Sequence, residues 1–267
     1  MKTLLRNLVS RSPRLKGLLQ RGLRFMLPGR GVSNHYVEMA GEEVGRESVR
    51  LRSAWKDDGL PVRQRELVDQ QLAAYRRGDA VDVFDVMVKC LQGLRDGVGK
   101  MRVLEVGCSS GYYSEVFEIA GLDLDYSGCD YSDAFIAMAR QRYPREHFDV
   151  QDATLLGYAD KTFDVVISGC CLLHIPEYEA AVAETARVAG RYAVFHRTPV
   201  VLGQPSKHYR KQAYGVETVE THFNEPQFLQ LLADNGLQLQ ATLTLDESVV
   251  HGLGSATRTY VCRKNSP

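Results

Sequence analysis

Two acidic residues and two glycines stand near the ends of two neighbouring apolar segments. Glu105 and Gly107 end the first segment, Gly111 follows four positions later, and Asp130 ends the second segment, 23 residues after Gly107. A carboxylate at this distance from a glycine turn can accept hydrogen bonds from both hydroxyls of a ribose. The spacing therefore predicts a site for a ligand that contains a nucleoside.

These residues require a buried strand that turns sharply into a helix. Residues 103–106 form a mostly apolar run, typical of a strand covered on both faces, and residues 112–120 have helical spacing. Gly107 lets the backbone approach a ligand closely, and Gly111 lets the helix pack tightly on the strand. Since open α/β sheets bind ligands at the carboxyl ends of their strands, the turn is the expected ligand site. The alternative is an ordinary strand, turn and helix that bind nothing.

The residue types at the turn distinguish two classes of cofactor. A dinucleotide site uses G-x-G-x-x-G and places pyrophosphate at the helix N-terminus, whereas this chain has only Gly107 and Gly111, in a G-x-x-x-G spacing. Glu105 would also repel a pyrophosphate. S-adenosylmethionine has no phosphate, carries ammonium and sulfonium charges that suit an acid, and has a carboxylate that suits a helix N-terminus. The turn therefore favours S-adenosyl-L-methionine over a nicotinamide dinucleotide.

At this turn the chain resembles the class I, Rossmann-like S-adenosylmethionine-dependent methyltransferases, whose first motif is D/E-x-G-x-G-x-G. Ser109 stands at the middle glycine position, where it must reach a backbone angle that glycine adopts easily. The resemblance implies that Asp130 binds the ribose and that Asp152 accepts a hydrogen bond from the adenine amine. The cofactor-binding residues that it implies are Glu105, Gly107, Cys108, Ser109, Gly111, Asp130, Tyr131, Asp152, Ala153 and Gly169.

The remaining segments fit the sheet of this family. Strands that alternate with helices and end in two strands indicate an α/β fold. We expect a Rossmann-like, mostly parallel sheet whose last strand is antiparallel, with an N-terminal helical extension. The expected units are a basic arm and helical cap over residues 1–95 and a class I methyltransferase domain over residues 96–267. Strands are predicted at residues 124–130, 148–150, 162–168, 191–195, 237–245 and 257–262, and helices at 47–54, 61–77, 81–94, 132–139, 177–188 and 225–235.

In two segments the apolar residues follow neither the spacing of a helix nor that of a strand. Residues 29–45 are rich in glycine and polar residues and are predicted to form a loop. Residues 200–222 are rich in Tyr, Lys and His, and because long ordered loops are uncommon unless they are functional, we expect a substrate-facing insert there. Trp55, Gln64 and Tyr36 are candidates for a lid, with an ordinary core or solvent position as the alternative for each.

Two histidines, His174 and His196, lie near the carboxyl ends of predicted strands. Imidazole titrates near neutral pH and can remove a proton from an O–H or N–H nucleophile, so both are candidate catalytic bases. Methyl transfer depends mainly on a well-positioned nucleophile, because the sulfonium already activates the methyl group. A purely structural role is the alternative for each histidine.

Composition gives the expected environment of the protein. The 33 basic and 33 acidic residues cancel, and 44% apolar with 25% charged residues is typical of a soluble domain. Six cysteines without paired C-x-x-C spacing predict reduced thiols and no metal site. No apolar run approaches the roughly 18 residues that a membrane span requires. We therefore expect a cytoplasmic protein.

The N-terminal segment has a charge pattern of its own. The first 30 residues hold eight basic residues and no acid, with apolar residues at helical spacing between them and Pro13 dividing the segment. A basic amphipathic arm can bind an anionic membrane surface, so we expect peripheral contact with the inner face of the membrane through residues 1–28. A targeting presequence and a helix packed on the domain are the alternatives.

The methyl acceptor is indicated only by weak similarities. The Tyr-rich segment, Arg197-Thr198-Pro199 and Ala213-Tyr214-Gly215 resemble bacterial methyltransferases of surface-glycan or secondary pathways, which implies a small-molecule acceptor. One alternative is RNA, although basic residues are spread outside the arm and no RNA-binding module precedes the core. The other is a catalytically inactive, methyltransferase-like binding subunit. DNA is not an expected partner.

Overall fold

The computed structural model describes residues 32–94, 99–250 and 253–265, so the arm over residues 1–28 lies outside the described residues. Among these residues, ten strands form one sheet. Its centre is five parallel strands in the order β6-β5-β2-β3-β4. Their bounds are β2 (Met101–Val106), β3 (Leu124–Asp130), β4 (His147–Val150), β5 (Phe163–Gly169) and β6 (Ala189–Leu202).

The chain order reverses between β2 and β5. From β2 the chain moves outward through β3 to β4, and β5 and β6 then lie on the other side of β2. Parallel sheets open a crevice at the carboxyl ends of the two strands where the order reverses. This topology therefore fixes the position of a ligand site before any side chain is considered.

The C-terminal hairpin completes this part of the sheet. It consists of β9 (Leu237–Val250) and β10 (Leu253–Lys264), and β10 pairs antiparallel with both β9 and β6. The predicted α/β class, the mostly parallel sheet and its antiparallel last strand are confirmed.

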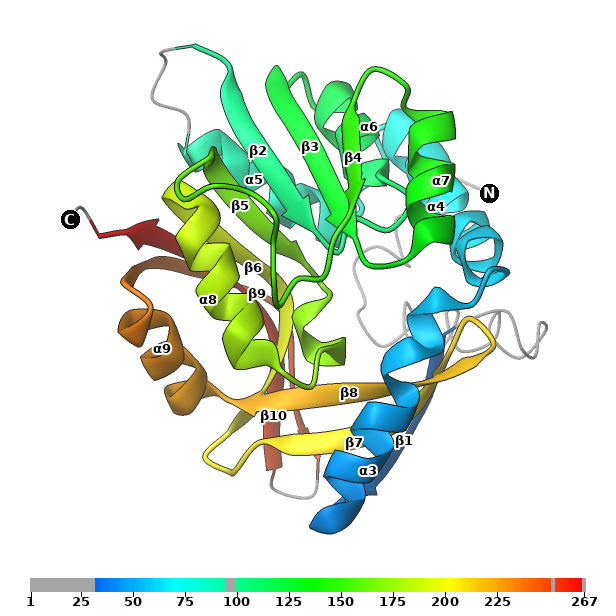
Figure 1. The fold of residues 1–267 in the computed structure, drawn as a ribbon, viewed down its shortest axis with the longest axis vertical. Coiled ribbons are helices and arrows are strands. Elements are labelled where there is room, and N and C mark those ends of the chain that lie inside the picture. Colours follow the sequence, from blue (N-terminus) through cyan, green and yellow to red (C-terminus); the bar gives the residue numbers. More distant parts are fainter. Residues whose placement is uncertain (1–31, 95–98, 251–252, 266–267) are drawn as a thin grey trace, which may run out of the picture.

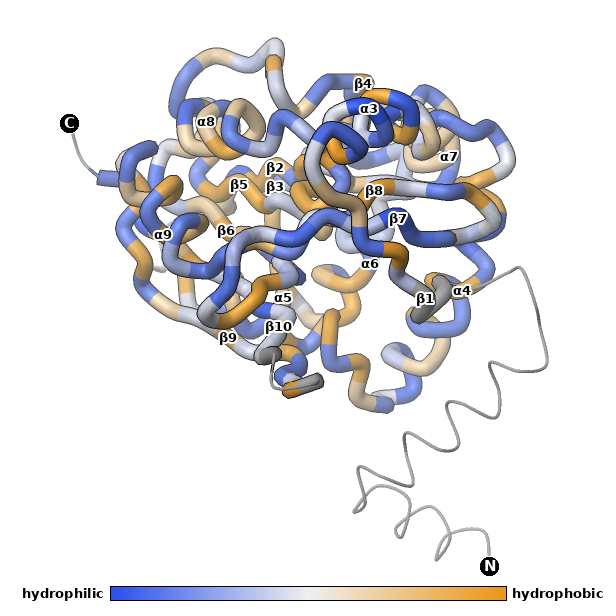
Figure 2. The backbone as a smooth tube through the Cα atoms, turned by 90° about the horizontal axis from the view of Figure 1, so that it is seen from below, coloured by the Kyte–Doolittle hydropathy of each residue, from blue (hydrophilic) through white to orange (hydrophobic). Residues whose placement is uncertain are grey.

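Helices cover both faces of the parallel strands. On one face, α5 (Asp82–Leu94) and α6 (Tyr112–Ile119) share a core with Val103 and Ile167. α7 (Asp133–Arg142) lies on the same face, since its Ile136 and Ala139 belong to this core, and it contacts β3 and β4. On the other face, α8 (Tyr178–Val188) and α9 (Glu225–Asp234) pack over β6 and β8. Figure 2 shows hydrophobic segments along the inner strands and hydrophilic ones over much of the outer surface. Burial on both faces explains why these strands are apolar without alternation.

The chain before the parallel strands is more structured than predicted. β1 (Val32–Met39) and the start of α3 (Glu42–Leu51) occupy most of residues 29–45, so the predicted loop is wrong there. Next come the short 3₁₀ helix η1 (Arg52–Lys56) and α4 (Leu60–Arg76). β1 exists because it pairs with β7, more than 160 residues away in the chain, which no local pattern reveals.

The expected loop over residues 200–222 is also wrong. It contains β7 (Lys207–Ala213) and most of β8 (Val216–Asn224), which form an antiparallel hairpin. The hairpin turns at Tyr214 (φ 51°) and Gly215 (φ 83°), two positive φ angles in the positions that a type I′ turn requires. We call β1, β7 and β8 the hairpin extension; Figure 1 shows it crossing below the carboxyl ends of the parallel strands.

Strand β6 joins the parallel strands to the hairpin extension. Its first half pairs with β5, whereas Val200 and Val201 pair with β8. Between these halves β6 has a bulge, because Phe195 pairs with Tyr260 and Thr198 with Arg258, so that two residues of β6 oppose one of β10. The bulge bends β6 toward the extension. No helix in the described part of the chain has both the length and the apolar character of a membrane span.

Candidate active site

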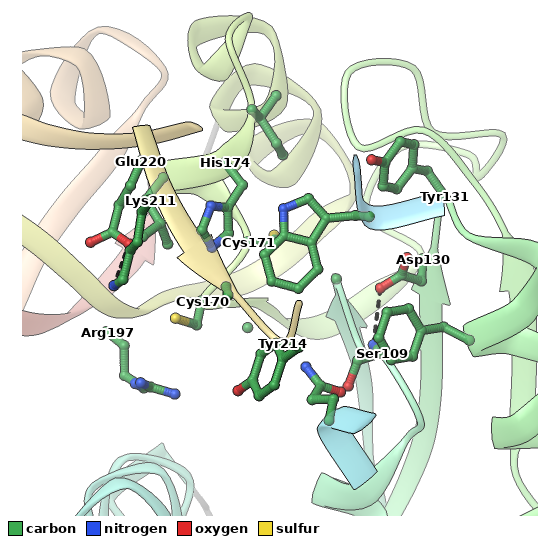
Figure 3. A pocket seen from close by; sticks show the side chains of 18 of the residues that line it. Ser109, Asp130, Tyr131, Cys170, Cys171, His174, Arg197, Lys211, Tyr214 and Glu220 are labelled. Atoms are coloured by element: carbon green, nitrogen blue, oxygen red, sulfur yellow. Dashed lines mark hydrogen bonds and ion pairs between the residues drawn. The ribbon is translucent and has the colours of Figure 1, made fainter. Parts of the chain in front are cut away.

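A cavity of about 1350 Å³ lies at the carboxyl ends of β2, β3 and β5. Residues of the parallel strands line one side, and residues of α4, η1 and the hairpin extension line the other. Ligand pockets usually measure about 300–1000 Å³, so this cavity has room for two small molecules side by side. We call its two sides the strand-end wall and the extension wall; Figure 3 shows side chains of both.

The glycine turn shapes the strand-end wall. Gly107 has φ 74°, and a Cβ placed on it would lie 2.3 Å from the Cβ of Cys171. A Cβ on Gly111, at φ 72°, would lie 2.6 Å from the ring of Phe148. Ser109 takes the positive φ that the sequence required of it, 48°. Both glycines are therefore needed for close packing, and Gly107 and Ser109 line the cavity.

Asp130 lies at the end of β3 and lines the cavity beside this turn. Its Oδ2 accepts from the backbone N–H of Ser109 at 3.0 Å (Figure 3). Its Oδ1 accepts from the backbone N–H of Ser132, also at 3.0 Å. Burial raises the pKa of Asp130 to about 6, while these backbone donors act in the opposite direction. A carboxylate offers about four acceptor positions, so two remain for hydroxyl donors. This donor arrangement fits the ribose contact implied by the sequence.

Seven of the ten implied cofactor-binding residues line the cavity. They are Gly107, Ser109, Asp130, Tyr131, Asp152, Ala153 and Gly169. Gly111 does not line it and acts through the packing of α6.

Glu105 and Cys108 lie beneath the strand-end wall. Glu105 is 2% exposed, accepts a hydrogen bond from the hydroxyl of Tyr126, and sits directly under Gly169, whose added Cβ would lie 2.5 Å from Glu105 Oε1. Burial raises the pKa of Glu105 to about 8, so the carboxyl is largely protonated at neutral pH. Cys108 is 1% exposed and packs against Gly128. The structure does not bring either side chain to the cavity.

Helix η1 bridges the two walls. Arg52 forms ion pairs with Asp152 (2.8 Å) and Glu177 (3.3 Å), and its carbonyl accepts a hydrogen bond from the hydroxyl of Tyr131. Trp55 donates to Thr218 Oγ1 of β8 at 2.9 Å. η1 is thereby fixed to the strand ends and to the hairpin extension at once. No local pattern indicates Arg52, because the partners in its two ion pairs lie 100 and 125 residues away.

The three residues suggested for a lid all line the cavity: Tyr36, Trp55 and Gln64. The indole of Trp55 packs against the ring of His174, with centroids 4.6 Å apart. Gln64 Oε1 is buried and has no hydrogen-bond partner among the described residues. A buried acceptor without a partner is costly, and it would be satisfied by an N–H donor of a ligand.

His174 ends the 3₁₀ helix η2 (Leu172–His174), which follows β5, and it lines the cavity. Its Nδ1 lies 2.7 Å from the carbonyl of Val219. A carbonyl can only accept, so Nδ1 carries the proton and Nε2 of the neutral ring keeps its lone pair. Burial lowers the pKa of His174, which keeps the ring neutral. His174 therefore has the form required of a proton acceptor.

His196 lies in the core, apart from His174. It is 1% exposed and does not line the cavity. Its Nε2 is 3.0 Å from the hydroxyl of Tyr113, and its Nδ1 is 3.0 Å from Thr259 Oγ1. Burial lowers the pKa of His196 to about 3. These contacts indicate a structural role for His196, which links β6 to α6 through Tyr113 and to β10 through Thr259.

The extension wall contains polar residues that the sequence did not single out. Lys211 Nζ contacts Glu220 Oε2 and the hydroxyl of Tyr36, each at 2.7 Å. Burial alone would raise the pKa of Glu220, but His222 and Lys211 hold it at about 2, so this carboxylate is ionised. Tyr214, at the hairpin turn, also lines the cavity. Only the Tyr-Gly pair at 214–215 was a local signal for this hairpin.

The model of one protein family, described as a methyltransferase domain, matches residues 104–194. A demethylmenaquinone methyltransferase from Renibacterium salmoninarum is 36% identical over 96 residues, which cover 35% of this chain and 40% of that protein. A probable S-adenosylmethionine-dependent methyltransferase from Mycolicibacterium smegmatis is 28% identical over 157 residues, 58% of this chain and 57% of that protein. The similarity thus spans about half, or less, of these relatives.

Solved structures share the fold over a larger part of the chain. The 1,6-didemethyltoxoflavin-N1-methyltransferase of Burkholderia thailandensis superposes with a TM-score of 0.54 and 15% identity, covering 88% of this chain and 95% of that one. Together with the family match, this superposition supports the predicted fold. Residues 104–194 match a methyltransferase domain, and the chain has the Rossmann-like fold of such proteins. The class and its cofactor, S-adenosylmethionine, are those predicted from the sequence.

Proposed function

We propose that the protein transfers the methyl group of S-adenosylmethionine to a small-molecule acceptor. The observation that carries this proposal is a cavity with two different walls. The strand-end wall has the carboxylate and glycine turn that a nucleoside needs, the extension wall offers aromatic rings, and His174, which follows β5, adds a neutral imidazole. When bound, the cofactor supplies a methyl group activated by the sulfonium. The remaining task of the protein is to position the acceptor.

Three groups would hold the cofactor, two on the strand-end wall and one on α4 opposite it. Asp130 would accept from the ribose hydroxyls, and Asp152 lies where the adenine is expected. Gln64 Oε1, which is buried and without a partner in the described structure, would accept from the ammonium group. This assigns to Gln64 the role that the sequence suggested for Glu105, which lies beneath the wall.

The extension wall supports a small acceptor. The rings of Trp55, Tyr36 and Tyr214 line it, and flat or partly apolar molecules bind such surfaces well. Similar proteins carry the names demethylmenaquinone methyltransferase, trans-aconitate 2-methyltransferase and 1,6-didemethyltoxoflavin-N1-methyltransferase, all of them acting on small molecules. A glycan precursor or a secondary metabolite would fit the same description.

His174 is proposed as the base where the acceptor atom is an oxygen or nitrogen. Its Nδ1–H is fixed by the Val219 carbonyl at 2.7 Å, which orients the ring and leaves Nε2 free to accept the proton released on methylation. Such a base contributes about 10²- to 10⁴-fold to the rate of a reaction that needs it. A carbon or sulfur acceptor would need it less.

Calorimetric titration with S-adenosylmethionine tests the cofactor assignment. We expect binding to the wild-type protein, and Asp130→Ala should weaken it by about 1–3 kcal/mol because the ribose contact to a charged acceptor is lost. Asp125→Ala is the matched control, since Asp125 is an exposed residue of the same strand. Absence of binding, or tighter binding of NAD, would contradict the proposal.

Transfer of a radiolabelled methyl group tests the acceptor class. The protein is incubated with labelled S-adenosylmethionine and, in parallel, with a fractionated small-molecule extract and with total RNA. Label in a small-molecule fraction is expected. Label in RNA, with a steep dependence of binding on salt, would favour the RNA alternative. Cofactor binding without transfer to either pool would favour an inactive binding subunit.

A further inference from the structure

Arg197 differs from the other basic residues of the cavity. Its side chain is partly buried, yet the guanidinium has no ion pair or hydrogen bond to any residue in the described part of the chain. Burying a charge without a partner is costly. Each of the other Arg and Lys side chains that line the cavity has an acidic partner, in the pairs Arg52–Asp152, Arg63–Asp57 and Lys211–Glu220.

The backbone holds Arg197 in this position at some cost. Arg197 has φ 57° and lies in the bulge of β6 opposite Thr259, where the register with β10 shifts. A bulge re-aims side chains, and a positive φ in a residue other than glycine is strained. Among the described residues, five that are not glycine have positive φ, and four of them line the cavity: Ser109, Cys170, Arg197 and Tyr214. Strain gathered in this way is typical of binding sites.

The surroundings of Arg197 supply hydrogen-bond donors and no free acid. The pKa of Arg197 is raised, first by the thiol of Cys170 and then, against the effect of burial, by the hydroxyls of Tyr112 and Tyr214 among others. Figure 3 shows the guanidinium extending toward the Tyr214 hydroxyl. Three cavity carboxylates already have other partners, in the contacts Asp130–Ser109, Asp152–Arg52 and Glu220–Lys211. None of these three carboxylates therefore neutralises the guanidinium of Arg197.

We propose that the methyl acceptor carries a carboxylate group and that Arg197 binds it. The guanidinium fork pairs with the two oxygens of a carboxylate, and the hydroxyls of Tyr112 and Tyr214 can donate to the same group. One unpaired cation matches one negative charge, whereas a phosphate monoester carries about two at neutral pH and would need a second cation. This assignment of the acceptor class rests on the function proposed above.

The test compares matched pairs of ligands by calorimetry. Protein loaded with S-adenosylhomocysteine is titrated with benzoate, 4-hydroxybenzoate and cinnamate, each beside its neutral primary amide, because the extension wall is aromatic. We expect at least one carboxylate to bind about tenfold or more tightly than its amide. In Arg197→Gln this preference should fall to within about threefold with unchanged affinity for S-adenosylhomocysteine, and Arg197→Lys should retain part of it.

Arg102→Gln is the matched control, because Arg102 pairs with Asp164 at the start of β2, away from the cavity, and should behave as the wild type. No preference for any carboxylate in the wild-type protein would overturn the proposal. So would a loss of more than about tenfold in affinity for S-adenosylhomocysteine in Arg197→Gln, since the guanidinium would then bind the cofactor's own carboxylate. Failure of the wild-type protein to bind S-adenosylhomocysteine would refute the proposed function itself.

Discussion

The two walls of the cavity are assembled in different ways. The strand-end wall is built from successive strand ends, and the family match covers most of it, over residues 104–194. The extension wall joins segments far apart in the chain: Tyr36 contacts Lys211, 175 residues later, and Trp55 contacts Thr218, 163 residues later. The family match ends before Arg197. In the proposed function, the matched part of the chain supplies Asp130 and Asp152 for the cofactor, whereas most of the extension wall lies outside the match.

The walls also differ in charge. Under the strand-end wall, burial raises the pKa of two carboxyls, Asp130 to about 6 and Glu105 to about 8. Across the cavity, Lys211 is paired with Glu220, whereas Arg197, in the bulge of β6, has no acidic partner among the described residues. The Asp130 carboxylate suits a ligand with sulfonium and ammonium charges, and the unpaired Arg197 suits an anion. If this comparison is right, substitutions in each wall should have separable effects.

The largest effect is expected in the strand-end wall, from Gly107→Ala. A Cβ at Gly107 would lie 2.3 Å from the Cβ of Cys171, at a backbone angle that only glycine adopts freely. Strain and overpacking together should lower the free energy of unfolding by about 3–5 kcal/mol. Urea denaturation measures this change, and calorimetry measures the expected loss of cofactor affinity.

Gly121→Ala separates the two causes of that loss. Gly121 has a similar φ of 70° but nothing within 4 Å of the added Cβ, so this variant should lose only about 1–2 kcal/mol. Equal losses in the two variants would mean that the contact with Cys171 is unimportant. The close packing of the glycine turn would then not be what shapes this wall.

A second, smaller effect distinguishes the two histidines. His196→Ala should lower the free energy of unfolding by about 2–3 kcal/mol, because a buried ring is removed and the hydroxyls of Tyr113 and Thr259 each lose one hydrogen-bond partner. Cofactor affinity should stay near that of the wild type. Thermal and urea denaturation measure stability, with His147→Ala, an exposed histidine, as the control. A fully stable His196→Ala protein that cannot transfer methyl groups would instead identify His196 as the base.

Sequence reasoning located the strand-end wall because its determinants are local. The strand, glycine turn and helix over residues 103–120, and the acid at position 130, depend on neighbours in the chain. The same reasoning could not tell which way Glu105 points, because the strand is buried on both faces and its pattern does not alternate. Residues around the cavity that follow from pairing with distant strands, such as Arg197 in its bulge, leave no local signal.

The smallest expected effect concerns the buried carboxyl beneath the strand-end wall. The pKa of Glu105 is raised to about 8 in the folded protein, above the ordinary value of about 4.3 in the unfolded chain. Between these values the folded state holds a proton that the unfolded state has lost. The contribution of Glu105 to stability is therefore complete below about pH 4 and is lost as the pH rises through about 8. Asp130, with a pKa of about 6, acts in the same direction but only up to that lower pH.

Glu105→Gln isolates the upper part of this pH dependence. The amide oxygen can still accept from the hydroxyl of Tyr126, but the side chain cannot ionise. Urea denaturation at pH 6, 7 and 8 should show a decline in the free energy of unfolding that is smaller than in the wild type by about 2 kcal/mol over that range. Glu118→Gln, at an exposed position, should keep the wild-type slope. An unchanged slope in Glu105→Gln would mean that Glu105 is ionised in the folded protein, and the strand-end wall would then carry a negative charge directly beneath Gly169.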